Sequence, residues 1–428
     1  MNKGFIFLGI FISGVLIFSQ YSFVAQGFQL NFFSSTKEKS HMFEVQSIDT
    51  MKYSRDMAGQ ILNDPHAFDK MIDGQMSLIA NTGATHVAID TPYDDHFIPV
   101  LTEWVTSARQ HHLSVWFRGN FSGWEGWFNY SKIDRDTHKI LLASFIQKNP
   151  TLFLDGDILT PCPECENGAA GDPRQTGDKD GYNAFLVEEK KIADSEFSKE
   201  GKLVTVYTSM NADIAREIIT PETAHALGGT ILIDHYVNTN EKFTSDIASI
   251  PKKFSGKIGI GEMGAPVPDL NGDMTDSQQA SYVQGMMDAL YAQSDILPVV
   301  NYWVLTGGST AIVNDDGSPK PAYKVLQKYF TAPKLSGITY NSLGESLHHV
   351  KITVASSTYT YTTTSSSYQV FLPTPLNTVI FSSEGYSPFI YSIGSTNTSS
   401  LKKNVYLEPI NPSSWYSIRF FFHQFTKK

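Results

Sequence analysis

The sequence predicts an α/β protein, a (β/α)8 TIM barrel followed by a small all-β sandwich domain. Two observations predict this fold class. Eight short β-rich runs alternate with helical stretches between residues 41 and 333, which is the count and size of a (β/α)8 barrel. In residues 334–410 the composition changes to Ser, Thr, Tyr and Val in short alternating runs separated by turn residues, a pattern typical of a β-sandwich.

The eight expected strands are apolar or β-branched and each is followed by a turn. They cover residues 43–50, 85–93, 113–121, 153–164, 203–211, 230–237, 257–264 and 298–308. Amphipathic stretches predict helices, for example over 64–83, 97–112, 135–149, 276–293 and, with a proline near its start, 319–332. A doubly wound open sheet is the main competing fold, but its G-x-G-x-x-G fingerprint after the first strand is missing.

Residues 1–27 predict a signal peptide or an N-terminal anchor. Lys3 precedes an apolar run over residues 5–18, which is short for a membrane span and suits a signal-peptide core. The small-residue pattern at 25–27 is an imperfect cleavage site, so cleavage and membrane attachment both stay open. In either case we expect a secreted or cell-surface protein, in which residues 28–40 form a linker.

Charge, cysteines and missing motifs exclude several function classes. A formal net charge of -10 argues against nucleic acid as a partner. The only cysteines, Cys162 and Cys165, lie in CPEC without a second CxxC, so a local disulfide or two free thiols is favoured over metal or redox chemistry. HExxH, G-x-S-x-G and P-loop motifs are also missing. We expect no metal, no cofactor and a monomer.

The active site of a (β/α)8 barrel lies at the C-terminal ends of its strands. Hydrolysis of a glycosidic bond needs two carboxyl groups, a neutral one to protonate the leaving oxygen and a charged one to attack or to activate water. Aromatic rings supply flat surfaces for sugars, and Asn and Arg bind hydroxyls. The expected strand ends carry such a set, namely Asp49, Asp90, Tyr93, Trp116, Arg118, Asn120, Glu164, Glu166, Asn167, Tyr207, Asn211, Asp234, His235, Tyr236, Glu262, Asn301, Tyr302 and Trp303.

Residues 41–333 resemble glycoside hydrolase clan A, the retaining (β/α)8 glycosidases that include the family-five cellulases and mannanases. The resemblance rests on IGEMG around Glu262, on Tyr236 in DHY and on Trp303. It implies that Glu262 is the nucleophile and that an acid/base glutamate follows the fourth strand. There the family usually has Asn-Glu, whereas this chain reads CPECEN, so we choose Glu164 as the acid/base and keep Glu166 as the alternative.

These residues predict retaining hydrolysis of O-glycosidic bonds in an oligo- or polysaccharide by double displacement, with Glu164 and Glu262 catalytic. The departure at the fourth strand leaves a second hypothesis, a non-catalytic carbohydrate-binding surface protein on a glycosidase-like barrel. Expected substrate-binding residues are Arg118, Asn120, Glu166, Asn167, Tyr207, His235, Tyr236 and Trp303.

Residues 334–410 resemble a carboxypeptidase-regulatory-like, prealbumin-type β-sandwich. The matching text is GITYNSLGESLHHVKITVAS, TYTTTSSSYQVFLP, VIFSSEGYSPFIYSI and NVYLEP. In that family the module is an accessory of secreted enzymes, which implies a binding or spacing role without chemistry. The tail over 411–428 mixes aromatic and basic residues, and a membrane-surface segment and a plain packing segment both stay open.

Overall fold

The computed structural model describes residues 39–411 except 170, 356–359, 364, 375–376 and 395–398. The expected signal or anchor segment, the linker up to residue 38 and the tail beyond residue 411 lie outside the described residues. Among the helices of the described part, none is both long enough and apolar enough to cross a membrane.

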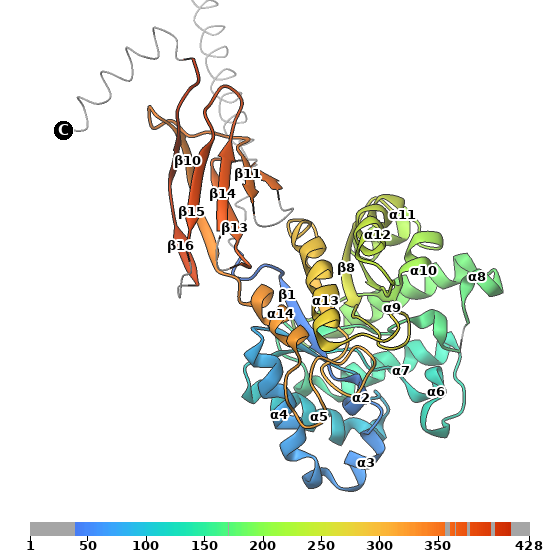
Figure 1. Cartoon of the computed structure of the whole chain (residues 1–428). Helices are drawn as coiled ribbons and strands as arrows, with labels where there is room; N and C mark the ends of the chain where they lie inside the picture. Colours follow the sequence, from blue (N-terminus) through green and yellow to red (C-terminus); the bar gives the residue numbers. More distant parts are fainter. Residues whose placement is uncertain are drawn as a thin grey trace, which may run out of the picture. The chain divides into compact units, whose positions relative to one another are not determined.

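A parallel sheet of nine strand segments forms the centre of the first domain, with helices around it (Figure 1). The segments follow one another in the order β5-β4-β3-β2-β1-β9-β8-β7-β6. Their bounds are β1 (Val45–Asp49), β2 (His86–Ile89), β3 (Ser114–Phe117), β4 (Ile158–Leu159), β5 (Thr205–Val206), β6 (Ser209–Asn211), β7 (Thr230–Asp234), β8 (Lys257–Glu262) and β9 (Val299–Tyr302).

The two ends of this sheet are pieces of one strand, because only Tyr207 and Thr208 separate β5 from β6. β5 pairs with β4, and β6 pairs with β7, both in parallel. Between them the Tyr207 N–H donates to the Leu159 carbonyl (3.0 Å), and the Thr208 carbonyl accepts from the Leu232 N–H (3.0 Å). The sheet therefore closes on itself, and the predicted (β/α)8 barrel is confirmed.

The barrel interior is filled by a compact apolar layer rather than by a pore. Because side chains alternate along a strand, the next inward position lies two residues nearer the C-terminal end. From Trp116 this step leads to Arg118, and from Leu232 it leads to Asp234. Polar groups therefore lie directly above the apolar layer, whose members are Val45, Ala88, Trp116, Ile158, Leu232 and Val299.

Alternating glycines in β8 make room for this interior. A Cβ on Gly259 would lie 2.5 Å from Leu232 Cδ2 and 2.8 Å from Val299 Cβ. A Cβ on Gly261 would lie 2.2 Å from Asp234 Oδ1. The run IGIGE thus points isoleucines out towards the helices and leaves the inward positions empty, so that neighbouring strands fill them.

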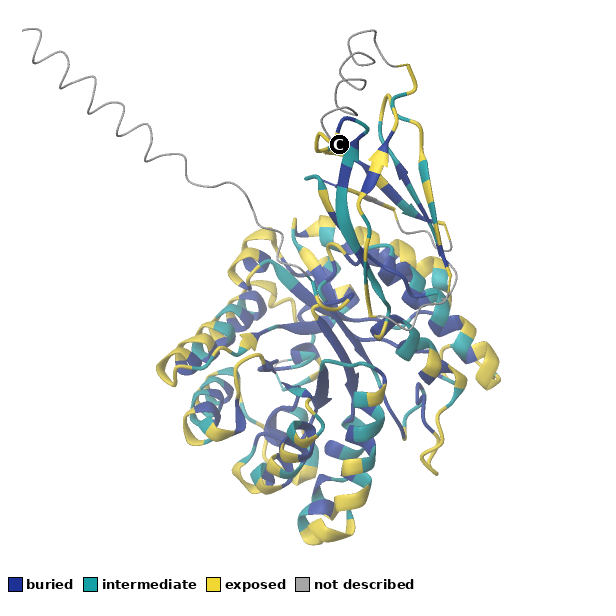
Figure 2. Cartoon of the chain, turned by 90° about the vertical axis from the view of Figure 1, so that its left-hand side faces the viewer, coloured by how far each residue is buried: buried dark blue, intermediate teal, exposed yellow. Residues whose placement is uncertain are grey.

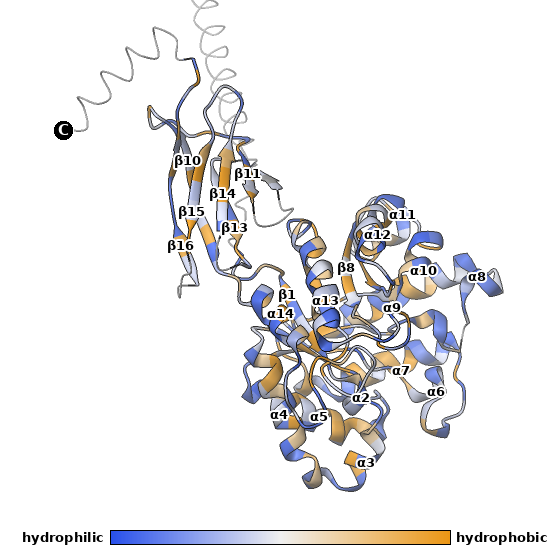
Figure 3. Ribbon diagram, viewed as in Figure 1, coloured by the Kyte–Doolittle hydropathy of each residue, from blue (hydrophilic) through white to orange (hydrophobic). Residues whose placement is uncertain are grey.

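The helices cover the sheet with apolar faces (Figures 2 and 3). In α5, Leu101, Trp104 and Ala108 are fully buried at helical spacing, whereas Thr102 and Thr106 are exposed. The helices are α2 (Met51–Ser54), α3 (Ala58–Asn63), α4 (Asp69–Asn81), α5 (Ile98–Gln110), α6 (Ser122–Glu125), α7 (Arg135–Lys148), α8 (Pro173–Thr176), α9 (Lys179–Lys199), α10 (Ala212–Glu217), α11 (Pro221–Ala226), α12 (Asn240–Lys253), α13 (Asp276–Tyr291) and α14 (Pro321–Phe330), with 3-10 turns η1 (Pro65–Ala67), η2 (Asp95–Phe97), η3 (Trp127–Asn129), η4 (Pro150–Leu152) and η5 (Cys165–Asn167).

The second domain is all-β, as predicted. One sheet has the order β13-β10-β16, with β17 also paired to β10, and the other has the order β12-β11-β14-β15. Tyr368 and Phe381, one from each sheet, meet edge to face with ring centroids 5.0 Å apart. The strands are β10 (Lys334–Asn341), β11 (Lys351–Val354), β12 (Thr360–Thr362), β13 (Ser367–Phe371), β14 (Asn377–Ser382), β15 (Phe389–Ile393), β16 (Ser400–Lys402) and β17 (Val405–Leu407).

The expected fourth strand over 153–164 is mostly wrong, because only Ile158–Leu159 forms a strand. Pro161 and Pro163 cannot donate to a sheet, which explains why the ladder stops before them. The chain turns instead, and a Cys162–Cys165 disulfide closes the turn, with the two Cα atoms 5.3 Å apart. Glu164 lies in this loop at a φ of 45°, not at the end of a strand.

Gly259→Ala should lower the free energy of unfolding by about 1–3 kcal/mol, because the new methyl group overpacks the barrel interior. Urea denaturation followed by tryptophan fluorescence measures the change. Gly74→Ala is the matched control: Gly74 lies inside α4 with nothing within 4 Å of the added Cβ, so alanine should stabilise by up to about 1 kcal/mol. Equal effects at both positions would contradict this account of β8.

Candidate active site

One buried guanidinium joins the strand ends of the barrel. Arg118 follows β3 and is 1% exposed. Its Nη1 donates to the Gly261 carbonyl (2.9 Å) and lies 3.4 Å from Asp49 Oδ2. Its Nη2 lies 3.2 Å from Asp234 Oδ2 and 3.1 Å from Glu262 Oε1. Arg118 therefore connects β1, β3, β7 and β8 at the C-terminal face of the barrel.

Carboxyl groups outnumber this single cation. Burial raises the pKa of Asp49 to about 6, although Arg118 opposes that rise. Burial also raises the pKa of Asp90 and Asp234 well above the usual range, and the charge of Glu262 adds to the rise in both. Burial therefore opposes ionisation of the three aspartates, whereas the charge of Arg118 favours it.

Glu262 at the end of β8 is contacted by two hydrogen-bond donors. Arg118 faces Oε1, and the Tyr236 hydroxyl donates to Oε2 at 2.9 Å. The Tyr236 ring meets Trp303 edge to face, with centroids 6.1 Å apart. Trp303 is fixed in turn by its indole N–H, which lies 3.4 Å from the Met51 sulfur. Glu262 is thus an oriented carboxylate beside an aromatic surface.

Glu164 lies in a contrasting environment that favours the neutral acid. Burial raises its pKa well above the usual range, and the charges of Asp234 and Glu262 raise it further. Both carboxyl oxygens are held, Oε1 by the Asn211 side-chain amide at 2.9 Å and Oε2 by Asn167 at 3.0 Å. Asn167 therefore contacts the Glu164 carboxyl group itself, and both carboxyl oxygens are held in fixed positions.

Glu166 is occupied by the protein. It is 2% exposed, accepts from the Tyr182 hydroxyl (2.8 Å) and accepts from the Asn211 backbone N–H (2.6 Å). Because Asn211 in turn holds Glu164, Glu166 fixes the backbone that orients the neighbouring acid. Its burial leaves it poorly placed to touch substrate, and Glu164 is the glutamate of CPECEN that faces the other site carboxyls.

Two expected substrate-binding residues lie away from this cluster. Tyr207 packs against the apolar layer of the barrel interior and feels the charge of Glu44, which precedes β1 at the N-terminal end. His235 faces α12, with Nε2 3.1 Å from Asp246 Oδ2 and its ring stacked on Phe243. The physical reasons differ: Tyr207 points into the barrel but lies one layer below the site, two residues before Ser209, whereas His235 follows the inward Asp234 and points out towards the helices.

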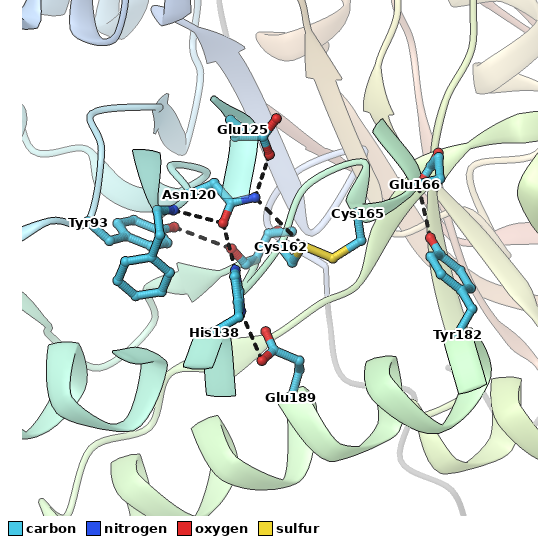
Figure 4. Close-up of a disulfide and its surroundings, with 11 residues drawn as sticks. Tyr93, Asn120, Glu125, His138, Cys162, Cys165, Glu166, Tyr182 and Glu189 are labelled. Carbon is cyan, nitrogen blue, oxygen red and sulfur yellow. Dashed lines mark hydrogen bonds and ion pairs between the residues drawn. A yellow bond between two sulfur atoms is a disulfide. The ribbon is translucent and has the colours of Figure 1, made fainter. Parts of the chain in front are cut away.

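Asn120 is also committed to internal contacts (Figure 4). Its Oδ1 accepts from the Phe121 N–H (2.8 Å) and lies 2.7 Å from His138 Nε2, while Nδ2 donates to Glu125 Oε1 (2.5 Å). The amide therefore holds Glu125 rather than a substrate. Trp124, on α6 in the loop after β3, is buried against His138.

Three aspartates, Asp49, Asp90 and Asp234, form the floor of the site, whereas the sequence placed them only among the polar residues at strand ends. Asp49 caps a turn, since it accepts from the Met51 N–H at 2.7 Å, and it also faces Arg118. A sequence signal for their shared position exists: Asp49, Asp90 and Asp234 each follow an isoleucine at a strand end. The isoleucine points out to the helices, so the aspartate points in.

No group of three or more His, Cys, Asp or Glu side chains within the described ranges is arranged to hold a metal ion. Arg118 and Tyr236 contact Glu262, and Asn211 and Asn167 contact Glu164.

Solved structures that resemble this chain include glycoside hydrolases. GH5_18 from Streptomyces cattleya in complex with GlcNAc has a TM-score of 0.48 and 13% identity, covering 69% of this chain and 84% of that chain. XacCel5A in complex with cellopentaose has a TM-score of 0.47 and 12% identity, covering 68% and 100%. An FMN-binding β-glucuronidase from Facaelibacterium prausnitzii L2-6 has a TM-score of 0.44 and 12% identity, covering 77% and 54%.

No family model matches the chain, and no curated protein matches it. The chain spans about half the length of the β-glucuronidases it resembles, 54% of one and 47% of another. At these identities the likeness concerns the fold. The (β/α)8 barrel that the resemblance to clan A implies is present. The pairing of this chain's own strands establishes it.

Arg118→Met should lower the free energy of unfolding by about 3–5 kcal/mol near pH 8, because it leaves buried carboxylates without their cation. The loss should be smaller near pH 5. Raised folded-state pKa values mean that the folded protein keeps protons which the unfolded chain releases, so stability falls as the pH rises towards those values. Urea denaturation at both pH values measures this.

Arg216→Met is the matched control, since this arginine is partly exposed and pairs with Asp213 on the surface of α10. It should cost less than about 1 kcal/mol at either pH. A similar, pH-independent cost for both variants would contradict the central role of Arg118.

Proposed function

We propose that this protein is an exported glycoside hydrolase that cleaves O-glycosidic bonds with retention of configuration, using Glu262 as nucleophile and Glu164 as acid/base. One observation carries the proposal: the two glutamates lie in different surroundings on the same face of the barrel. Arg118 and the Tyr236 hydroxyl contact Glu262, whereas burial and neighbouring charges raise the pKa of Glu164.

In the first step the Glu164 proton passes to the glycosidic oxygen while a Glu262 carboxylate oxygen attacks the anomeric carbon. The bond to the leaving sugar breaks, and a covalent glycosyl-enzyme remains. Glu164, now a carboxylate, takes a proton from water, and the water oxygen attacks the same carbon. This releases Glu262 and restores the proton on Glu164.

Neighbouring residues assist each step of this scheme. Arg118 and the Tyr236 hydroxyl hold the nucleophile in one orientation, which reduces the entropy lost on attack. Asn211 and Asn167 keep the acid directed at the leaving oxygen. Trp303 supplies an aromatic surface against Tyr236 on which a sugar ring of an oligo- or polysaccharide stacks.

The proposal also assigns roles to the segments outside the barrel. Residues 1–27 would direct export and, if retained, attach the protein to a membrane as a secreted or surface-bound monomer. The carboxypeptidase-regulatory-like β-domain would serve as an accessory that spaces the barrel from the cell surface or binds polymer.

Glu262→Gln should reduce turnover of oligosaccharides by on the order of a thousand-fold or more, because the amide cannot form the glycosyl-enzyme. Release of reducing sugar from a panel of β-linked glucans and mannans measures turnover, and calorimetry measures binding, which should remain. Glu200→Gln, on an exposed residue after α9, should leave turnover unchanged.

Wild-type activity that survives Glu262→Gln would contradict the mechanism. The alternative function, a non-catalytic carbohydrate-binding protein, is supported by the placement of Glu164 in a loop at a φ of 45° rather than at a strand end. It predicts that the wild type binds a glycan of the panel and releases no product.

Glu164→Gln and Glu166→Gln should separate the acid from its neighbour. Without its general acid the enzyme should lose activity on natural glycans by about a hundred-fold or more, yet keep most of it on aryl glycosides whose leaving group needs no proton. Glu166→Gln should lower both activities alike, because it disturbs Asn211. The ratio of the two rates is the measurement, and the reverse pattern would make Glu166 the acid.

A further inference from the structure

A third carboxyl lies at the C-terminal face of the barrel outside the Arg118 cluster. Glu125 ends α6, in the loop that follows β3. The charges that act on it are those of Arg55, which follows α2 and β1, and Glu166, which follows β4. Glu125 therefore lies among the loops that follow the first, third and fourth barrel strands, where substrate is expected.

A buried chain of polar side chains holds this carboxyl in place (Figure 4). Asn120 Oδ1 already accepts from a backbone N–H, so its amide orientation is determined and Nδ2 must face Glu125, at 2.5 Å. Behind Asn120, His138 Nε2 lies 2.7 Å from Oδ1, and His138 Nδ1 lies 3.0 Å from Glu189 on α9. His138 is 0% exposed and Glu189 is 2% exposed.

A buried chain of polar side chains lowers the stability of the protein unless its groups have hydrogen-bond partners. Glu125 is the end of this chain that lies near the barrel mouth. Glu125 Oε1 is used by Asn120. Oε2 accepts no hydrogen bond from any residue that the structure describes, and Glu125 is only half-buried. The arrangement presents one fixed, reachable carboxyl oxygen, which is the geometry of a hydroxyl-binding group.

The charges nearby favour a neutral sugar. Arg55 lies over the Trp127 ring, 4.8 Å from its centroid, and its charge is matched by Asp56 at 2.7 Å. A sugar that carried its own carboxylate would meet a surplus of acids and little unpaired positive charge. The carboxyl residues on this face are Asp49, Asp90, Asp234, Glu125, Glu164, Glu166 and Glu262.

We infer that Glu125 is a substrate-binding residue whose free oxygen accepts hydroxyl groups of a neutral sugar unit next to the one on which Glu164 and Glu262 act. Trp127, steadied by Arg55, lies beside it as a ring surface. This inference rests on the proposed glycosidase function and extends it to a substrate class, neutral oligosaccharides. No bond is made or broken at Glu125.

The charge of Glu125 should make binding depend on pH. Burial raises its pKa to about 7, the Asn120 amide and Arg55 oppose the rise, and Glu166 adds to it. The disulfide sulfurs beside Asn120 do not titrate. A carboxylate accepts two hydroxyls where the protonated acid accepts them less well, so affinity should increase as the pH rises through neutrality.

The test is calorimetric titration of the full chain carrying Glu262→Gln, with neutral cello- and manno-oligosaccharides and with galacturonate oligomers as probes, near pH 6 and near pH 8. Adding Glu125→Gln should weaken binding of a neutral probe about ten-fold near pH 8 and by less near pH 6. Glu188→Gln, on the exposed face of α9, is the matched control and should bind like its parent.

Equal affinity with and without Glu125→Gln at both pH values would overturn the inference while the proposed function stands, and tighter binding of the galacturonate oligomers would overturn the neutral-sugar assignment. A wild type that neither binds nor cleaves any sugar would instead remove the proposed function, and the inference with it. If Glu125→Gln fails to fold, Glu125→Asp replaces it in the test. The shorter side chain keeps the charge but moves the free oxygen away from the sugar, so it should also weaken binding.

Discussion

The buried guanidinium of Arg118 is the constraint on which the rest of the structure depends. A charge with almost no solvent contact must be matched by neighbours, and the barrel supplies them from three different strands. Those contacts hold the C-terminal ends of the strands in a fixed arrangement and place Glu262 at its edge. Gly261 is also needed for this arrangement, because the absence of a side chain leaves room for Asp234 to contact Arg118 beneath the site.

The cluster also makes the surroundings of two glutamates on one face different. Glu262 contacts the cation directly, whereas the charges of Asp234 and Glu262 act on the buried Glu164 and raise its pKa. Electrostatic asymmetry between two chemically identical side chains is therefore a product of position, and the proposed acid and nucleophile follow from it.

Much of the polar network lies around the reacting pair rather than in it. Glu166 and Tyr182 hold Asn211, which orients Glu164, and the chain from Glu189 through His138 and Asn120 orients Glu125. Tyr182 and Glu189, one from each of these two networks, both lie on α9. One long helix therefore positions two carboxyls that belong to different loops. Placement on a packed helix restricts motion of the loops, and this is what a site needs to hold a sugar in one orientation.

The sequence by itself determined the barrel and the all-β domain, because strand periodicity is a local property of the chain. The sequence also contains three strands that end in Ile-Asp. The tertiary structure brings these three aspartates to one site because it places the ends of the strands on one face of the barrel. Only the tertiary structure decided that Asn120 and Glu166 are internal supports, that Tyr207 and His235 face elsewhere, and that Glu125 offers a free oxygen. Those assignments depend on contacts between residues far apart in the chain and on a loop whose prolines end the fourth strand early, and neither periodicity nor motif spacing encodes them.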